Sequence, residues 1–269
     1  MGAGIAQVSA CAGYPVTLVD INADVIENGI ASIRSSLARM VSKGRLDQKT
    51  SDEALARIQT SLDLGGLAEC DLVVEAIPEV LELKTSTFNR LDAICKPSTI
   101  LASNTSSISI NTIAESTSRP DRVIGMHFMN PVPIMKLVEV INGTHTTDLV
   151  TSGVISVIEA LGKTPLQCND SPGFVSNRIL CPMINEAIIT LDEGVAEVDA
   201  IDGIMKLGMN HPIGPLALAD LIGLDTVLNI MRVLHEGLGD EKYAPSPLLV
   251  SMVSEGKLGR KTKIGFYEY

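Results

Sequence analysis

The sequence predicts an α/β domain with a doubly wound parallel sheet over residues 1–168, followed by an all-α domain over residues 169–269. Short apolar runs alternate with helical patterns as far as Cys168. After the turn-rich segment Asn169–Phe174, no strand-like alternation returns. Apolar residues make up 45% of the chain, with no Trp and only four Phe and four Tyr, so we expect aliphatic cores in both domains.

Composition and charge indicate which partners are excluded and in which compartment the protein is expected. The net charge of −11 argues against nucleic acid or a membrane surface as a partner. No apolar run is long enough for a membrane span, and no secretory signal or C-terminal peroxisomal signal is present. The five cysteines are scattered, without C-x-x-C pairs, which predicts buried reduced thiols and no metal site. We therefore expect an intracellular protein of the cytoplasm, with the mitochondrial matrix and the peroxisome as alternatives.

The first 20 residues read as the second half of a dinucleotide-binding βαβ unit. A helical pattern runs to about Ala12 and ends at Gly13, and Pro15–Asp20 is a short apolar strand that ends in an acid. Asp20 lies 18 residues after Gly2, close to the offset at which an acid meets the adenosine ribose. An acid there favours NAD over NADP, whose 2′-phosphate it would repel. The alternative is that Asp20 only caps the next helix.

The part of that unit expected before Met1 is missing. The first strand and the first two glycines of G-x-G-x-x-G are absent, and Gly2 can be only the third glycine. In the usual strand order 3-2-1-4-5-6, the first strand is central, so its loss would separate its neighbours. A truncated gene model or an alternative start would explain this beginning. We expect the chain as written to bind NAD poorly unless another segment fills the gap, which titration with NADH would test.

The remaining elements follow from their patterns. Between residues 21 and 168 we expect helices and buried strands in alternation, with the polar cluster Ser103–Ser107 at a strand's carboxyl end, where open α/β sheets bind ligands. The expected helices are 23–42, 49–60, 79–95, a short one from 109, and 147–161, and the expected strands are 71–77, 98–102, 122–128, 136–141 and 164–168. In the second domain we expect helices at 177–194, at 199–207 with Asp199 as N-cap, at 215–236 and at 248–255.

The stretch from Val123 to Ile141 holds the strongest chemical signal. Two apolar segments flank an Asn-Pro-Val-Pro turn, and each carries one ionisable residue, His127 and Glu139. Alternation places Glu139 between large aliphatic side chains, where a carboxylate is costly to bury without a partner. His127 is the simplest partner, and a carboxylate behind an imidazole makes it a better general base. The alternative from spacing alone is an edge Glu and a core His bonded to backbone.

Six segments in order resemble the L-3-hydroxyacyl-CoA dehydrogenase family, most closely its 3-hydroxybutyryl-CoA dehydrogenase branch. The resemblance covers essentially the whole chain through the segments Gly2–Gln7, Asp71–Ile77, Ala102–Ile108, Gly125–Glu139, Ser171–Arg178 and Gly214–Asp225. It implies a Rossmann-like NAD domain, a helical domain that forms a homodimer, and reversible oxidation of an L-3-hydroxyacyl-CoA to the 3-oxoacyl-CoA. A short-chain substrate is suggested by similarity alone.

The resemblance also implies roles for individual residues. His127 matches the general base and Glu139 its paired carboxylate, while Ser106 and Asn177 match residues that orient the substrate oxygen. The positions that match cofactor contacts are Gly2, Asp20, Glu79, Lys84, Asn104 and Asn130, and the pair that matches acyl-CoA contacts is Ser36 and Lys43. Ser36 and Lys43 are seven residues apart and share a helix face, for which a solvated surface is the alternative explanation.

Two other functions stay open at this point. A relative within the same fold oxidises a sugar acid in a gulonate-type reaction, and the chain could also be a non-catalytic dimerising remnant. One further departure is Lys263, where members of the family often have Gly; we expect a local change of turn there and no chemical consequence.

Overall fold

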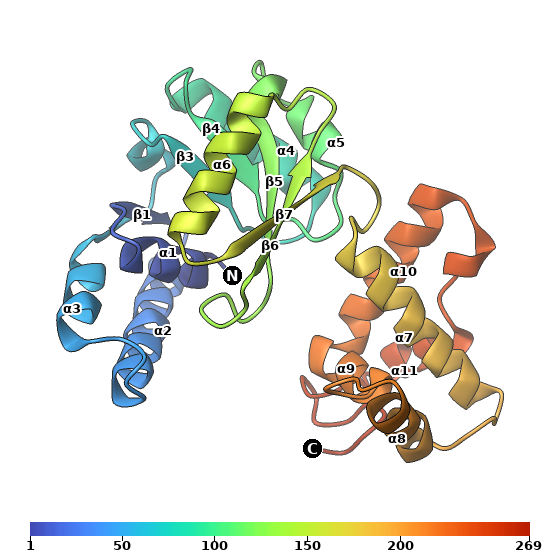
Figure 1. Ribbon diagram of the computed structural model, residues 1–269. Helices are drawn as coiled ribbons and strands as arrows, with labels where there is room; N and C mark the ends of the chain where they lie inside the picture. The colour runs from blue at the N-terminus through green and yellow to red at the C-terminus, as the bar shows by residue number, and fades with distance from the viewer. The chain divides into compact units, whose positions relative to one another are not determined.

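The computed structural model describes all residues, 1–269, and divides them into two compact units, Met1–Asp170 and Ser171–Tyr269 (Figure 1). The first unit is α/β and the second is built from helices, which confirms the predicted fold class. The division falls at Asp170, whereas the sequence pattern placed it after residue 168.

The first elements form a small two-stranded sheet with its own helices. In chain order they are α1 (Gly2–Cys11), β1 (Val16–Val19), α2 (Ala23–Ser42), α3 (Gln48–Ala56) and β2 (Ile58–Ser61). β1 and β2 pair in parallel. The helix predicted for 49–60 is therefore wrong at its end, because the last residues form β2. Its sequence, Ile-Gln-Thr-Ser, is too polar to be read as a buried strand.

A five-stranded sheet follows, with the spatial order β3-β4-β5-β6-β7. Its strands are β3 (Leu72–Glu75), β4 (Ile100–Ser103), β5 (Val123–Phe128), β6 (Leu137–Asn142) and β7 (Thr164–Asn169). β3, β4 and β5 are parallel, but β6 runs antiparallel to β5 and parallel to β7, so the sheet is mixed where we expected only parallel strands. The connection from β5 to β6 is only residues 129–136, and a parallel crossover needs a dozen or more residues.

Helices cover both faces of this sheet (Figure 1). They are α4 (Leu81–Ile94), α5 (Ile110–Ala114) and α6 (Asp148–Ala160). The short 3₁₀ helices η1 (Leu64–Leu67) and η2 (Pro120–Arg122) precede β3 and β5 in the chain. α6 presents Val150, Val154 and Ile158 to the sheet at four-residue spacing, which places them on one helix face. α4 and α5 lie on the opposite face.

The two sheets of the first unit do not join. β1 pairs only with β2, and β3 pairs only with β4. Helix α1 bridges them by packing. Its Ile5 belongs to the core over the five-stranded sheet, while Ala6 and Ala10 pack against Ile33 and Leu37 of α2.

The second unit surrounds one apolar core. Its helices are α7 (Ser176–Asp192), α8 (Val198–Gly208), α9 (Pro215–Ile222), α10 (Leu224–Leu238) and α11 (Pro247–Ser254), with the 3₁₀ helix η3 (Glu241–Tyr243). Two predictions are corrected here. The expected helix 215–236 is interrupted at Gly223, whose φ of 102° is left-handed backbone that favours glycine. The N-cap of α8 is Glu197, so Asp199 lies in its first turn.

Two buried carboxylates fasten the C-terminal segment to this unit. Asp220 is fully buried and accepts hydrogen bonds from the amides of Phe266 and Tyr267 at 3.1 and 2.9 Å, and from the Tyr269 hydroxyl at 3.1 Å. Asp202 accepts the Tyr267 hydroxyl at 3.0 Å. Lys263 lies in this segment with a φ of 63°, the backbone region in which glycine is favoured.

All five cysteines are free thiols. Only Cys95 and Cys181 are buried, so the prediction of five buried thiols is wrong for the other three, which are half-buried. No helix combines the length and the apolar character needed to cross a bilayer.

Candidate active site

His127 and Glu139 face each other across β5 and β6. They are direct partners in the antiparallel register, and His127 Nδ1 lies 2.8 Å from Glu139 Oε2. Both residues are buried, at 7% and 4% exposed. An ionised carboxylate can only accept, so Nδ1 donates its proton to Glu139 in this contact. The contact predicted from two apolar strands is therefore observed.

The strands that carry this pair are built for close contact. Every residue of β5 is buried, and Gly125 pairs with Ile141 in the same register as His127 with Glu139. A Cβ on Gly125 would lie 2.7 Å from Cβ of Ile141, so only glycine fits without displacing a strand. Cys168 on β7 is close enough for the Glu139 charge to affect it. Burial first, and then that charge, raise the pKa of the Cys168 thiol to about 11, which excludes a thiolate at neutral pH.

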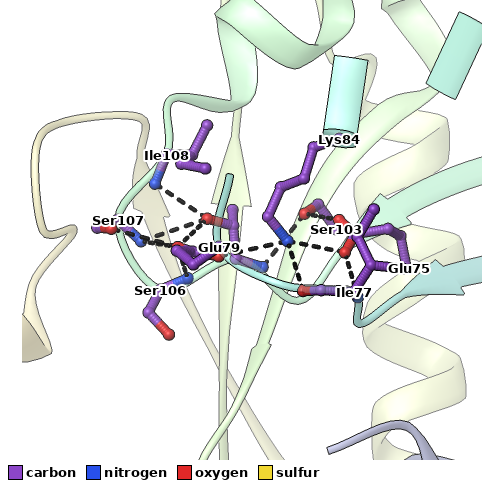
Figure 2. A network of polar contacts seen from close by, with 9 residues as sticks. Glu75, Ile77, Glu79, Lys84, Ser103, Ser106, Ser107 and Ile108 are labelled. Atoms are coloured by element: carbon purple, nitrogen blue, oxygen red, sulfur yellow. Dashed lines mark hydrogen bonds and ion pairs between the residues drawn. The ribbon is translucent and has the colours of Figure 1, made fainter. Parts of the chain in front are cut away.

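The loop after β4 is organised by a single carboxylate oxygen (Figure 2). Glu79 Oε1 accepts the Thr105 hydroxyl at 2.5 Å, the amides of Ser106 and Ser107 at 2.8 and 3.0 Å, and the Ser107 hydroxyl at 3.2 Å. Burial would raise the pKa of the Glu79 carboxyl. The hydrogen bond from Thr105 and the charge of Lys84 outweigh it and hold that pKa below its ordinary value. The backbone that carries Ser106 is thus held by a permanently ionised group at neutral pH.

Lys84 stands behind Glu79 and not on an open surface. Its side chain is 1% exposed, and its ammonium lies 2.7 Å from Glu75 Oε1 and 3.3 Å from Glu79 Oε2 (Figure 2). Glu75 in turn accepts the Ser103 hydroxyl at 2.6 Å and the Ile77 amide at 2.6 Å. The resemblance implied that Lys84 lines the cofactor. In this structure the Lys84 side chain is enclosed by protein groups, so Lys84 can influence a bound cofactor only through Glu79.

The two asparagines differ in their surroundings. Asn104 is buried, and its Oδ1 accepts the Phe128 amide at 2.9 Å, which ties the end of β4 to the end of β5. Asn130 is exposed at the start of the loop 129–136, before the cis peptide bond to Pro131. Asn104 therefore shapes the sheet edge, whereas the Asn130 side chain is accessible to a ligand.

The residues at the start of the chain fit part of an NAD site. Helix α1 begins at Gly2 with neither a side-chain cap nor an acid in its first turn, which suits a pyrophosphate at a helix N-terminus. A Cβ on Gly2 would lie 3.9 Å from Cβ of Ala76, an ordinary van der Waals contact. The third glycine of the fingerprint serves close packing between helix and strand, and Gly2 lies at such a contact. Asp20 follows β1 directly, and its Oδ1 accepts the Asn22 amide at 3.2 Å. The uncapped N-terminus of α1, the glycine at position 2 and the carboxylate of Asp20 therefore fit NAD.

The other predicted contacts are more dispersed. Ser36 is half-buried on α2, and Lys43 is exposed as the C-cap residue of the same helix. Asn177 lies in the first turn of α7, in the second unit. No group of three or more His, Cys, Asp or Glu side chains is arranged to hold a metal ion.

Sequence reasoning missed two polar residues that shape the site. Glu75 completes the network behind Glu79 together with Ser103 of the predicted polar cluster, and Asp170 Oδ2 accepts the Ser109 hydroxyl at 2.6 Å and the Asn111 amide at 2.9 Å at the start of α5. For Glu75 a signal was present. It is an acid at the end of an otherwise apolar strand, as Glu139 is within its own. Asp170 has no such signal, because its partners are 59 and 61 residues away.

Comparison with known proteins gives a consistent result over the whole chain. Residues 1–171 match the model of the 3-hydroxyacyl-CoA dehydrogenase NAD binding domain, and residues 173–269 match that of the C-terminal domain. The chain is 57% identical to a probable 3-hydroxybutyryl-CoA dehydrogenase of Deinococcus radiodurans, over 100% of this chain and 96% of that protein. It is 54% identical to the 3-hydroxybutyryl-CoA dehydrogenase of Bradyrhizobium diazoefficiens, over 100% and 92% of the two chains. The crystal structure of (S)-3-hydroxybutyryl-CoA dehydrogenase from Ralstonia eutropha superimposes with a TM-score of 0.97 at 50% identity, covering 100% of this chain and 95% of that one.

Proposed function

The chain belongs to the 3-hydroxyacyl-CoA dehydrogenase family, and on that premise we propose how its residues carry out the reaction. The protein is an NAD-dependent oxidoreductase that converts short-chain L-3-hydroxyacyl-CoA, such as 3-hydroxybutyryl-CoA, reversibly to the 3-oxoacyl-CoA. The relatives do not favour the sugar-acid alternative. The observation that carries the mechanism is the contact of 2.8 Å between His127 and Glu139.

In this mechanism His127 is the general base. Glu139 keeps the proton on Nδ1, so Nε2 takes the proton of the 3-hydroxyl, and the O–H electron pair forms the carbonyl as hydride leaves C3. Glu139 also stabilises the imidazolium that results. When NAD is bound, its nicotinamide supplies the acceptor for that hydride. In the reverse direction the imidazolium returns the proton to the carbonyl oxygen.

Other residues hold the reactants. Ser106, on the loop fixed by Glu79, and Asn177 are proposed to hydrogen-bond the reacting oxygen, while Asn130 is proposed to lie near the nicotinamide. Gly2, Asp20, Glu79 and Asn104 are proposed for the cofactor side, with Lys84 acting through Glu79. For acyl-CoA we propose Ser36 and Lys43 on α2, because the face that they share leaves Lys43 exposed to a phosphate.

The test is NADH oxidation with acetoacetyl-CoA as substrate. It is run on this chain, with NADH binding followed by titration, and on the same chain with an apolar strand ending in Gly-x-Gly added before Met1. We expect NADH oxidation that depends on acetoacetyl-CoA. Inactivity of both forms would refute the proposed mechanism.

A second copy of this chain is the proposed partner of α8. Ile204 and Leu207, three residues apart on this helix, are 60% and 90% exposed, and Met209 just beyond it is 62% exposed. Neighbouring exposed apolar side chains can mark a protein–protein interface. The resemblance implies a homodimer through this domain, so we propose that the patch is covered by a second copy. The relatives from Deinococcus radiodurans and Bradyrhizobium diazoefficiens are bacterial proteins, and we propose the cytoplasm as the compartment.

Leu207→Glu is expected to convert the dimer to a monomer, because it buries a charge in the proposed apolar interface. Mass is measured by size-exclusion chromatography with light scattering. The matched control is Leu149→Glu, which makes the same change at a 75% exposed position of α6 in the other unit. A monomeric wild type, or a dimeric Leu207→Glu variant, would contradict the proposal.

A further inference from the structure

Lys163 places a buried ammonium at the edge of the sheet where the catalytic strands end. It lies between α6 and β7, and the residue is 9% exposed. Its Nζ donates to the carbonyl oxygens of Val132 at 2.6 Å and Met135 at 2.7 Å. Lys163 takes part in no ion pair with a carboxylate, and burial lowers the pKa of its amine. Burying a charge without a counter-charge costs free energy, so the Lys163 ammonium is expected to serve a structural or functional purpose.

Both acceptors belong to the loop 129–136, which connects the strand of His127 to the strand of Glu139. Inside this loop the Pro131 carbonyl accepts the amides of Ile134 and Met135, each at 3.0 Å. The Val132 side chain is buried, and a Cβ on Gly4 of α1 would lie only 2.9 Å from its Cβ. The loop is thus held by Lys163 through its carbonyls and packed against α1 through Val132.

The side chains that leave this loop are accessible. Asn130 is exposed, Ile134 is 66% exposed and Met135 is 40% exposed. Apart from the buried Val132 side chain, the loop is held through its backbone, and the Lys163 ammonium is a donor that can satisfy two carbonyls at once. This is the arrangement expected of a loop whose outward side chains must keep fixed positions for a ligand.

We propose that Lys163 is a positioning residue that holds the loop 129–136 and, through it, Asn130 beside the reacting groups. This rests on the proposed function, because Asn130 matters only if cofactor and substrate bind at this edge. Lys163 touches neither of them and acts only through the loop. Acyl-CoA affinity, which depends on the remote Ser36 and Lys43, is not under its control.

The test compares Lys163→Met with wild type, with Lys163→Gln as a second variant and Lys49→Met as the control. Methionine fills a similar volume and removes both hydrogen bonds, while glutamine keeps N–H donors on a shorter, uncharged side chain. Lys49 is an exposed surface lysine with its side chain 86% exposed. Hydrogen exchange of the Ile134 and Met135 amides is measured without ligand. In Lys163→Met we expect it to become about tenfold faster, and kcat to fall about tenfold. KM for acetoacetyl-CoA should stay the same.

The outcomes separate positioning from mere stability. Faster loop exchange together with lower kcat and unchanged acyl-CoA KM supports the proposal. Faster exchange with unchanged kcat, or lower kcat with unchanged exchange, overturns it, and Lys163→Gln is judged by the same criteria if Lys163→Met does not fold. The exchange measurement needs no activity. It therefore shows whether Lys163 holds the loop even if no form of the protein turns over acetoacetyl-CoA and the proposed function fails.

Discussion

Replacing His127 by glutamine is expected to lower kcat by about 10²–10⁴-fold, because general-base catalysis is lost while the strand is kept. Glutamine can still donate to Glu139, so the buried carboxylate keeps a partner and the fold should persist. Turnover is measured with NADH and acetoacetyl-CoA in the form of the protein that binds NADH, and folding is checked by circular dichroism.

The matched control is His145→Gln, which makes the same substitution at an exposed loop residue and should leave kcat unchanged. Glu139→Gln is expected to lower kcat in the same direction, because an amide beside Nδ1 no longer selects the proton position that leaves Nε2 basic. Turnover near the wild-type rate in either His127→Gln or Glu139→Gln would refute the roles given to this pair.

Asp220→Ala is expected to lower the free energy of unfolding of the helical unit by about 3 kcal/mol or more. Asp220 is fully buried, and its loss leaves the amides of Phe266 and Tyr267 without their acceptor. Tyrosine fluorescence is a suitable probe because the chain has no Trp and three of its four Tyr lie in this unit, Tyr243, Tyr267 and Tyr269. The C-terminal segment should also become sensitive to proteolysis.

Asp225→Ala is the control for that variant, because it removes the surface ion pair of 2.7 Å with Lys261 on the same C-terminal segment. Both side chains are more than 40% exposed, so the expected cost is only about 0–1 kcal/mol. Equal destabilisation by the two substitutions would contradict the view that the buried carboxylate, and not the surface pair, fastens this segment.

The contact between His127 and Glu139 was predictable because each residue interrupts an apolar strand, and burial of an ionisable group demands a partner. The antiparallel direction of β6 was also within reach, since residues 129–136 are too few for a parallel crossover. β2 was not, because Ile58–Ser61 lacks the apolar character of a buried strand.

The contacts of Glu79 and Lys163 were the hardest to predict from the sequence. Glu79 meets Thr105, Ser106 and Ser107 across 26 to 28 residues, and Lys163 meets the carbonyls of Val132 and Met135 across 31 and 28 residues. These contacts depend on which strands become neighbours and on where a loop turns back. Periodicity along the chain carries no information on either point.

The antiparallel pairing of β5 and β6 also limits how this gene can change in length. His127 and Glu139 are opposite each other at a separation of 12 residues. Inserting or deleting one residue inside either strand would turn one of the two side chains to the other face of the sheet. Extra residues between Asn130 and Lys136 would leave the pairing intact but displace the carbonyls that Lys163 binds. We therefore expect viable insertions and deletions to avoid residues 123–142 and to collect in surface turns such as Lys43–Asp47.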